Sequence, residues 1–359
     1  MEKLTMLDYV KETPGVLRTN IEQYTALVEP LMKEVQQKEI KRILLVASGS
    51  SHNACYCARS FVEKVSGLEV RIITPYTFTY YENDIKENDL ILVVTQSGLS
   101  TNAIEALKII KKKQCRAICL TGNKNSDVKD VADVVIEYGV GEELVGYVTK
   151  GVSTLALFLD LFAITYSGKT EYLEELKKAV NLNEEMIEKA TEFIELHYKE
   201  FSSMSWVYSC GAGANYGTAL ESALKMGETI HIPSCCYEIE EYIHGPNLQL
   251  TPQYNVIFFD GNDGASHRVE QVYKATRKVS NRAYLISNNP GLADDDHVLS
   301  LSGTVSSELS PIVYLPFVQL LSFIISNDLH SIYQHPLLKE FKAIAAAKTE
   351  NFVNYDGDD

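Results

Sequence analysis

Two short segments rich in hydroxyl groups have the composition of an anion-binding site. Each follows an apolar run expected to be a buried strand and precedes a stretch expected to be a helix. Backbone amides at a helix N-terminus point outward, and the helix dipole favours negative charge there. The residues expected to hold an anion such as phosphate are Ser48, Gly49, Ser50 and Ser51, then Thr95, Gln96, Ser97 and Ser100. Serine and threonine are also common N-caps, so either segment alone has a purely structural interpretation.

A stripe of charged side chains is the second candidate for chemistry. Glu221, Lys225 and Glu228 fall at i, i+4 and i+7 of a helix expected over residues 214–230. If this stripe faces solvent, it is a salt-bridge ladder that contributes a few tenths of a kcal/mol per pair. If it faces a cleft, Lys225 would bias the charge of Glu228, which could then move a proton between adjacent carbon atoms.

His244 is a third candidate, on a loop just before Gly245 and Pro246. A loop histidine is commonly an ordinary surface residue. An imidazole that titrates near neutrality is nevertheless suited to proton transfer, so an acid/base role stays open.

The elements expected to position these residues alternate between strand and helix. Strands are expected over residues 42–47, 68–74, 90–95, 116–121 and 134–137, and helices up to 65 and over 100–113 and 149–166. Short apolar runs alternating with helices of ten or more residues predict a parallel sheet covered on both faces. The two hydroxyl-rich turns could then converge on one crevice at the carboxyl ends of the strands.

The strand–glycine turn–helix pattern then starts again. Gly211 follows Gly49 by 162 positions, and Gly261 follows Gln96 by 165. This internal repeat predicts two copies of one flavodoxin-like, three-layer α/β domain. We expect an N-terminal helical segment (1–39), a first domain (40–170), a helical connector (171–204), a second domain (205–310) and C-terminal helices with a tail (311–359). The second-domain turns are poorer in hydroxyls and carry Asp260 and Asp263, so the first domain is the one expected to bind phosphate.

Composition excludes several classes of function. A net charge of −15 disfavours nucleic-acid and anionic-membrane binding. No window approaches the ~20 apolar residues of a membrane span, and the N-terminus lacks the build of a signal peptide. The seven cysteines match no zinc or redox spacing, which favours reduced thiols, a cytoplasmic location, and neither metal nor cofactor.

A rival interpretation as a dinucleotide-binding enzyme rests on Gly211 and Gly213. It requires a clean following strand that ends in an acidic residue. Residues 232–238 look too short and broken for that strand, so this interpretation is disfavoured.

Four motifs together resemble the SIS (sugar isomerase) family over nearly the whole chain, from about residue 41 to 355. They are Ser48-Gly49-Ser50-Ser51, Gln96-Ser97-Gly98, the segment 219–228 and His244-Gly245-Pro246. The combination is similar to the double-SIS isomerase half of glucosamine-6-phosphate synthase and to the fructosamine-6-phosphate deglycases.

The resemblance implies roles for the candidate residues. The two hydroxyl-rich turns would form the phosphate and sugar pocket, and Glu228 would transfer protons between C1 and C2, with Lys225 beside it. His244 would open the sugar ring and reach in from a neighbouring subunit, which implies a homodimer. Lys348 lies in a segment that resembles the one whose lysine forms a Schiff base with the open-chain sugar.

Departures from the family pattern narrow the expected activity. Leu99 stands where glutamate is usual and Val148 where serine is common, so contacts to sugar hydroxyls are expected to differ. The chain shows no glutaminase domain and no N-terminal cysteine nucleophile. These features favour a deglycase, deaminase or isomerase that acts on an aminated ketose or aldose 6-phosphate. The alternative is a non-catalytic phosphosugar sensor, which is disfavoured because the ~40 residues before the sheet are too few and too acidic for the usual DNA-binding domain.

Overall fold

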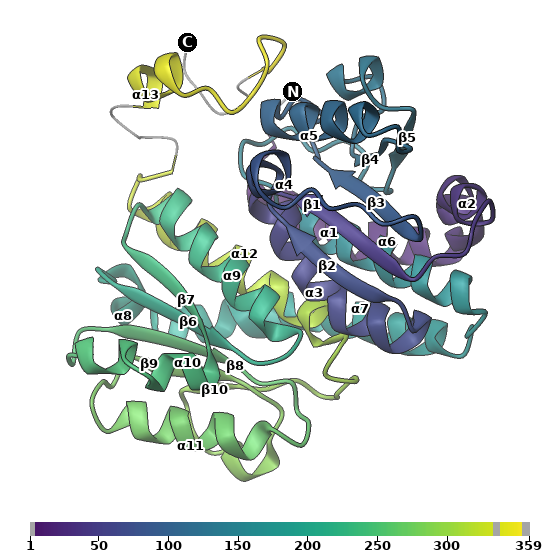
Figure 1. Ribbon diagram of the computed structural model, residues 1–359. Coiled ribbons are helices and arrows are strands. Elements are labelled where there is room, and N and C mark those ends of the chain that lie inside the picture. Colours follow the sequence, from purple (N-terminus) through teal and green to yellow (C-terminus); the bar gives the residue numbers. More distant parts are fainter. Residues whose placement is uncertain (1–3, 333–337, 354–359) are drawn as a thin grey trace. The chain divides into compact units, whose positions relative to one another are not determined.

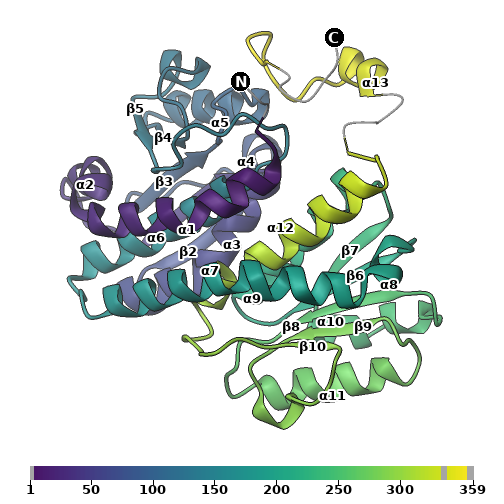
Figure 2. The same cartoon turned by 180° about the vertical axis from the view of Figure 1, so that it is seen from behind.

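The computed structural model of the protein describes residues 4–332 and 338–353. The described chain divides into two compact α/β units, which are treated separately (Figures 1 and 2). We call residues 15–173 with 338–353 the first unit, and residues 4–14 with 174–332 the second unit.

The first unit is built on a five-stranded parallel sheet. Its strands are β1 (Arg42–Ala47), β2 (Glu69–Ile73), β3 (Asp89–Val94), β4 (Ile118–Thr121) and β5 (Val134–Glu137), in the order β2-β1-β3-β4-β5. β1 and β3 are buried along their whole length, which explains why both read as continuous apolar runs. The strand order reverses between β1 and β3, and ligands of open α/β sheets bind at such a switch point.

Helices cover both faces of this sheet. The helices of the unit are α2 (Tyr24–Val35), α3 (Gly49–Ser66), α4 (Pro75–Tyr80), α5 (Thr101–Lys112), η1 (Asp127–Asp130) and α6 (Lys150–Ser167), and the exposed α13 (Leu338–Ile344) follows near the end of the described chain. Phe78 of α4 and Ala106 of α5 join one core cluster with alternate residues of β1 and β3, while α3 and α6 pack together on the opposite face (Figure 1). The N-terminal helical segment expected over 1–39 contains two helices. α1 (Met6–Glu22) ends before Gln23, and α2 begins after it.

The second unit repeats the topology of the first. Its strands are β6 (Val207–Gly211), β7 (Ser234–Glu238), β8 (Asn255–Phe259), β9 (Ala283–Ile286) and β10 (Val298–Leu299), in the order β10-β9-β8-β6-β7. Counted along the chain, both sheets have the order 2-1-3-4-5, and every strand pair is parallel. The predicted repeat of two flavodoxin-like α/β domains is therefore confirmed.

β7 corrects one step of the sequence reasoning. Residues 232–238 look too broken for a strand, yet Ser234–Glu238 pairs in parallel with β6. The apolar signal is weak because β7 is an edge strand whose residues are only partly covered. Glu238, the acidic residue at its end, accepts hydrogen bonds from the amides of Glu240 and Glu241 and so caps the next helix. This carboxylate is used within the fold, so dinucleotide binding stays disfavoured. The expectation that residues 232–238 form no strand was wrong.

The helices of the second unit complete its layers. They are α7 (Tyr172–Leu196), which starts in the first unit, α8 (Tyr198–Ser202), α9 (Asn215–Lys225), η2 (Met226–Ile230), α10 (Ile239–Ile243), η3 (Pro246–Gln249), α11 (Ser266–Arg277), η4 (Pro290–Leu292) and α12 (Ser310–Asp328). Tyr242 of α10 and Tyr273 of α11 belong to one core cluster with β6 and β8. α9 and α12 pack together on the other face (Figure 2).

α12 is more apolar than the sequence reading allowed. Among the described residues it is the one helix long and apolar enough to cross a membrane by length and composition. Its apolar window is 83% buried inside the protein, so it is the central helix of a core and not a membrane span. The expectation that no window approaches the required hydrophobicity was therefore too strong.

We expect Asp89→Asn to destabilise the first unit by about 3–5 kcal/mol, since it leaves a buried arginine uncompensated. Asp89 and Arg42 lie on adjacent strands and form a bidentate pair, with Nε–Oδ1 and Nη2–Oδ2 distances of 2.9 and 2.6 Å. Burial opposes ionisation of Asp89, but hydrogen bonds from Arg42 and the Lys86 amide lower its pKa below the ordinary value. The stabilisation is thus present above the unfolded-state pKa of about 3.9 and is lost as pH falls through the lower folded value.

Urea unfolding of both proteins at pH 7 and below pH 3 tests this expectation. Glu105→Gln, which breaks an exposed ion pair, is the control and should change stability by less than about 0.5 kcal/mol. Equal stability of Asp89→Asn and wild type at neutral pH would contradict the assignment.

Candidate functional site

The first hydroxyl-rich turn leaves the carboxyl end of β1 and enters α3. Ser48 is the extended N-cap, and Gly49 has φ of +57°, a left-handed conformation that glycine adopts without strain. Ser50 and Ser51 are buried in the first turn of the helix. The Asn102 side chain donates to Ser48 Oγ over 3.1 Å and so links this turn to the start of α5.

The second turn leaves β3 on the other side of the switch point. Thr95 Oγ1 donates to Ser100 Oγ over 3.1 Å, which closes the turn across its mouth. Gly98 has φ of +64°, and a Cβ there would lie 1.7 Å from Ser126 Oγ. No other residue fits this position without moving the turn. The amides of Gln96 and Ser97 have no hydrogen-bond acceptor among the described residues.

Lys348 places a cation in this second turn. Its Nζ donates to Ser97 Oγ and Ser100 Oγ, both over 2.9 Å. The segment around it is fixed by two backbone hydrogen bonds, from Thr101 N to Ala347 O (3.1 Å) and from Thr349 N to Leu99 O (2.9 Å). Burial lowers the pKa of Lys348. The structure thus brings Lys348 together with two of the eight residues expected to form the pocket, Ser97 and Ser100.

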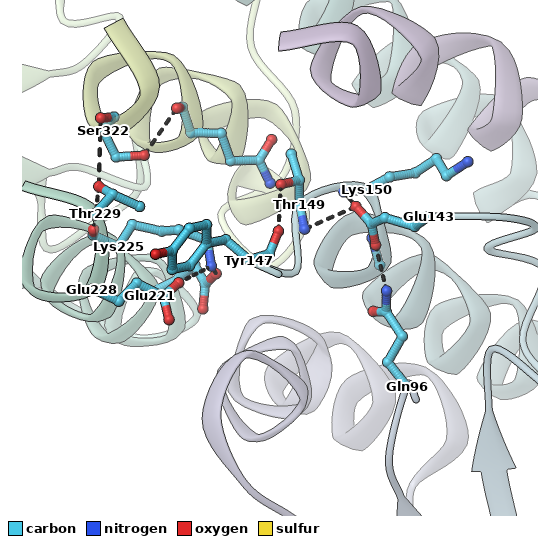
Figure 3. Close-up of polar contacts among 12 residues, drawn as sticks. Gln96, Glu143, Tyr147, Thr149, Lys150, Glu221, Lys225, Glu228, Thr229 and Ser322 are labelled. Carbon is cyan, nitrogen blue, oxygen red and sulfur yellow. Dashed lines mark hydrogen bonds and ion pairs between the residues drawn. The ribbon is translucent and has the colours of Figure 1, made fainter. Parts of the chain in front are cut away.

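Gln96 has a different environment from the one expected. Its side chain points away from the turn, and its Nε2 donates to the Glu143 carboxylate (Figure 3). Its Oε1 accepts from the Tyr138 hydroxyl over 3.0 Å. Only its backbone is therefore presented to a ligand. The sequence reasoning missed Glu143, Tyr138 and Asn102. A signal for Glu143 existed, because acidic residues shortly before a helix start often serve its N-terminus.

The equivalent turn of the second unit is already filled by a carboxylate. Asp260 Oδ1 accepts from the Asn262 amide (3.1 Å) and Ser266 Oγ (2.6 Å), and Oδ2 accepts from Ser287 Oγ (2.7 Å). Asp260 is 2% exposed, and its negative charge and occupied donors disfavour an external anion at this turn. This arrangement supports the expectation that phosphate binds the first unit.

The charged stripe of the second unit is buried, so its interpretation as a solvated ladder is wrong. Lys225 Nζ lies 3.2 Å from Glu221 Oε1 and 2.5 Å from Glu228 Oε1 (Figure 3). The side chains of Lys225 and Glu221 are 0% exposed, whereas that of Glu228 is 29% exposed. Glu228 is therefore the member of this group that remains open to a ligand or to water.

The backbone widens where it carries Glu228. α9 ends at Lys225 and continues as the single π-helical turn η2, a feature frequent at functional sites. Gly227 permits this turn to pack closely on β7, since a Cβ there would lie 2.9 Å from Ser234 Oγ. Thr229 Oγ1 donates to Lys225 O over 2.8 Å and holds the turn in place.

Electrostatics adapt Glu228 to proton transfer. Burial raises the pKa of Glu228, and the adjacent Lys225 opposes that rise without cancelling it. Burial alone would lower the pKa of Lys225, but the Glu221 and Glu228 carboxylates raise it above the ordinary value. Shifted pKa values of this kind cluster at functional sites, which makes Glu228 a candidate for proton transfer.

His244 does not join Glu228 within this chain. It ends α10, where its amide donates to Glu241 O, and Gly245 follows with φ of +146°. Its side chain is exposed and makes no hydrogen bond or ion pair with Glu228 in the described structure.

One side-chain group of the second unit has ligand atoms close enough for a metal ion. Asp295, Asp296 and His297 offer atoms within 4.8 Å of one another in the described part of the chain. These side chains already have partners, since Asp295 accepts from Tyr273 and His297 Nδ1 lies 2.6 Å from Asp296 Oδ1. The group contains no member of the turns or of the charged stripe.

The two repeated sheets and the serine-rich switch-point turns define the class, an α/β protein whose structure is similar to the double-SIS type. Residues 38–165 match the SIS domain family. Glutamine–fructose-6-phosphate aminotransferase [isomerizing] of Sulfurisphaera tokodaii is 24% identical over 323 residues, covering 89% of this chain and 52% of that protein. The chain spans about half the length of the relatives it matches.

Solved structures show the same fold over nearly the whole chain. A proposed phosphosugar isomerase from Clostridium difficile 630 is similar with a TM-score of 0.85 and 23% identity, covering 96% of this chain and 99% of that one. The C-terminal domain of glucosamine-fructose-6-phosphate aminotransferase from Francisella tularensis gives 0.77 and 23%, with coverages of 91% and 97%.

Proposed function

We propose that the protein is a sugar-phosphate isomerase or deglycase that acts on an aminated ketose or aldose 6-phosphate. The observation that carries the proposal is Lys348 Nζ between the hydroxyls of Ser97 and Ser100, at the switch point of the first sheet. A phosphate there would meet an ammonium group, serine hydroxyls and the unpaired amides of the turn. The similar proteins are named as aminotransferases of fructose 6-phosphate, and these names support the same class of substrate.

The proposed chemistry is a proton shift between neighbouring carbons. Glu228 as carboxylate takes the proton from C1 or C2 of the open-chain substrate, and the electron pair forms an enediol or enaminol. The carboxyl group then returns the proton to the other carbon, so that no redox partner is needed. Lys225 stays protonated beside Glu228 and stabilises its carboxylate.

Two further roles belong to this proposal. His244, which is exposed on its own chain, opens the sugar ring in the active site of a second subunit, so the working form is a homodimer in the cytoplasm. The neutral form of Lys348 condenses with the open-chain carbonyl to an imine and releases water, a step that its lowered pKa favours because the neutral amine is the nucleophile. All seven cysteines are free thiols, which fits a reducing compartment.

A substrate panel tests the proposed function. Purified protein is incubated with fructosamine 6-phosphates, glucosamine 6-phosphate, and fructose 6-phosphate with ammonia, and released amine and sugar products are scored. Turnover of at least one aminated sugar phosphate is expected. Binding without turnover of any of them would instead favour the sensor interpretation, and absence of both would refute the proposal.

A further inference from the structure

The Glu143 carboxylate lies at the N-terminus of α6 and accepts hydrogen bonds from three helix amides and from Gln96. Its Oε1 accepts from the amides of Thr149 (2.9 Å) and Lys150 (2.6 Å). Its Oε2 accepts from the Gly151 amide (3.2 Å) and from Gln96 Nε2. One carboxylate therefore joins the start of α6 to the second hydroxyl-rich turn (Figure 3).

The side-chain carboxamide and the backbone carbonyl of Gln96 are both held by hydrogen bonds. The Tyr138 hydroxyl donates to its Oε1, and its carbonyl accepts from the Gly122 amide (2.9 Å) and Thr121 Oγ1 (3.1 Å). With its side chain fixed at both ends and its carbonyl fixed by hydrogen bonds from Thr121 and Gly122, Gln96 holds the peptide that it shares with Ser97 in one orientation. The Ser97 amide of this peptide and the Gln96 amide of the preceding one have no acceptor in the described structure and stay available to a ligand.

Gly151 shows how closely the Gln96 carboxamide is packed. We call the contacts of Glu143 and Tyr138 with this carboxamide the clamp. A Cβ on Gly151 would lie 1.7 Å from Gln96 Oε1, so a side chain there would displace the carboxamide. An ordinary helix cap for α6 would need only the contacts to the amides of Thr149, Lys150 and Gly151. The contact through Oε2 to Gln96 adds nothing to the helix and has its effect at the turn.

We infer that Glu143 is a positioning residue for the phosphate-binding turn, acting through the Gln96 carboxamide. This inference rests on the proposed function, since it assigns to Glu143 the affinity of the proposed phosphate site. Glu143 touches no substrate atom in this role. It sets the direction of the Gln96 and Ser97 amides, and the ionised carboxylate is the form that can accept all four hydrogen bonds.

A double-mutant cycle separates this role from helix capping. Glu143→Gln is compared with wild type in the natural background and in the Gln96→Ala background, with inorganic phosphate and a sugar 6-phosphate as ligands. In the natural background the substitution puts an amide donor against Gln96 Nε2 and should raise Kd and KM about tenfold, with kcat changed less than about threefold. In the Gln96→Ala background the added effect should fall below about twofold, because the partner is gone.

Thermal unfolding supplies the second readout. The loss of melting temperature from Glu143→Gln should persist in the Gln96→Ala background, since the α6 amides are affected in each. Glu142→Gln is the matched control: it is the neighbouring exposed glutamate, and only its backbone carbonyl is used, by Lys150 Nζ. It should leave Kd, KM and melting temperature unchanged.

A second variant keeps the inference testable if Glu143→Gln does not fold. Tyr138→Phe removes the other end of the clamp without touching α6, and its effect on Kd should also vanish in the Gln96→Ala background. An equal change of Kd in both backgrounds would overturn the inference while leaving the proposed function intact. A wild-type protein that binds neither ligand would refute the proposed function itself, and the positioning role with it.

Discussion

Glu228→Gln is expected to lower kcat by about 10²–10⁴-fold, because general acid–base catalysis contributes about that much. The amide is nearly isosteric, and Lys225 keeps its pairing with the fully buried Glu221, so the fold should be retained. Sugar-phosphate affinity should change less than about threefold, since the proposed phosphate contacts lie in the first unit. Steady-state kinetics and calorimetric titration with the best substrate of the panel measure the two effects.

The pH profile provides an independent check on Glu228. Because burial raises its pKa, the wild-type rate should fall as pH drops through a value above that of an ordinary glutamate. Glu192→Gln, an exposed residue of α7, is the control and should keep wild-type kinetics. Full activity of Glu228→Gln, or an acid limb unchanged in a residually active variant, would remove Glu228 from the mechanism.

Lys348→Ala is expected to weaken sugar-phosphate binding by about 10–100-fold, since hydrogen bonds to a charged group contribute about 1.5–3 kcal/mol. The loss follows from removing the ammonium group that Ser97 and Ser100 hold. Lys348→Arg keeps a positive charge and should recover most of the binding. It should not recover turnover, because a guanidinium stays protonated and forms no imine.

Chemical trapping distinguishes the two roles of Lys348. Borohydride added during turnover should reduce an imine and increase the mass of the peptide that contains Lys348, with no adduct in Lys348→Arg. Lys342→Ala, on α13, is the control and should behave as wild type. Wild-type turnover by Lys348→Arg would limit Lys348 to charge binding.

The fold could be predicted from the sequence wherever burial is two-sided. β1, which is buried along its whole length, begins and ends at the expected residues because its apolar run is bounded by polar residues. β5 also has the expected bounds, although it is an edge strand. β7 was missed since an edge strand needs no continuous apolar run, and β10 because two residues carry almost no pattern. η2 also gives no sequence signal, so the expected helix 214–230 could not show its wider last turn.

The candidate site was predictable residue by residue but not in its contacts. Periodicity placed Glu221, Lys225 and Glu228 on one stripe, yet it could not tell a buried stripe from an exposed one. Contacts between distant positions, such as Lys348 with Ser100 or Gln96 with Glu143, depend on tertiary packing. The inward direction of the Gln96 side chain likewise depends on tertiary packing and has no signal in the sequence.

The filled turn around Asp260 has a consequence for stoichiometry. A duplicated domain could in principle give two equivalent binding sites per chain, and hence cooperative or biphasic saturation. With Asp260 acting as a built-in occupant of the second copy, we expect each chain to take up a single equivalent of sugar phosphate. The second copy, which we expect to bind no phosphate, instead carries the charged group of Lys225 and Glu228. A phosphate bound next to this group would disturb its electrostatics.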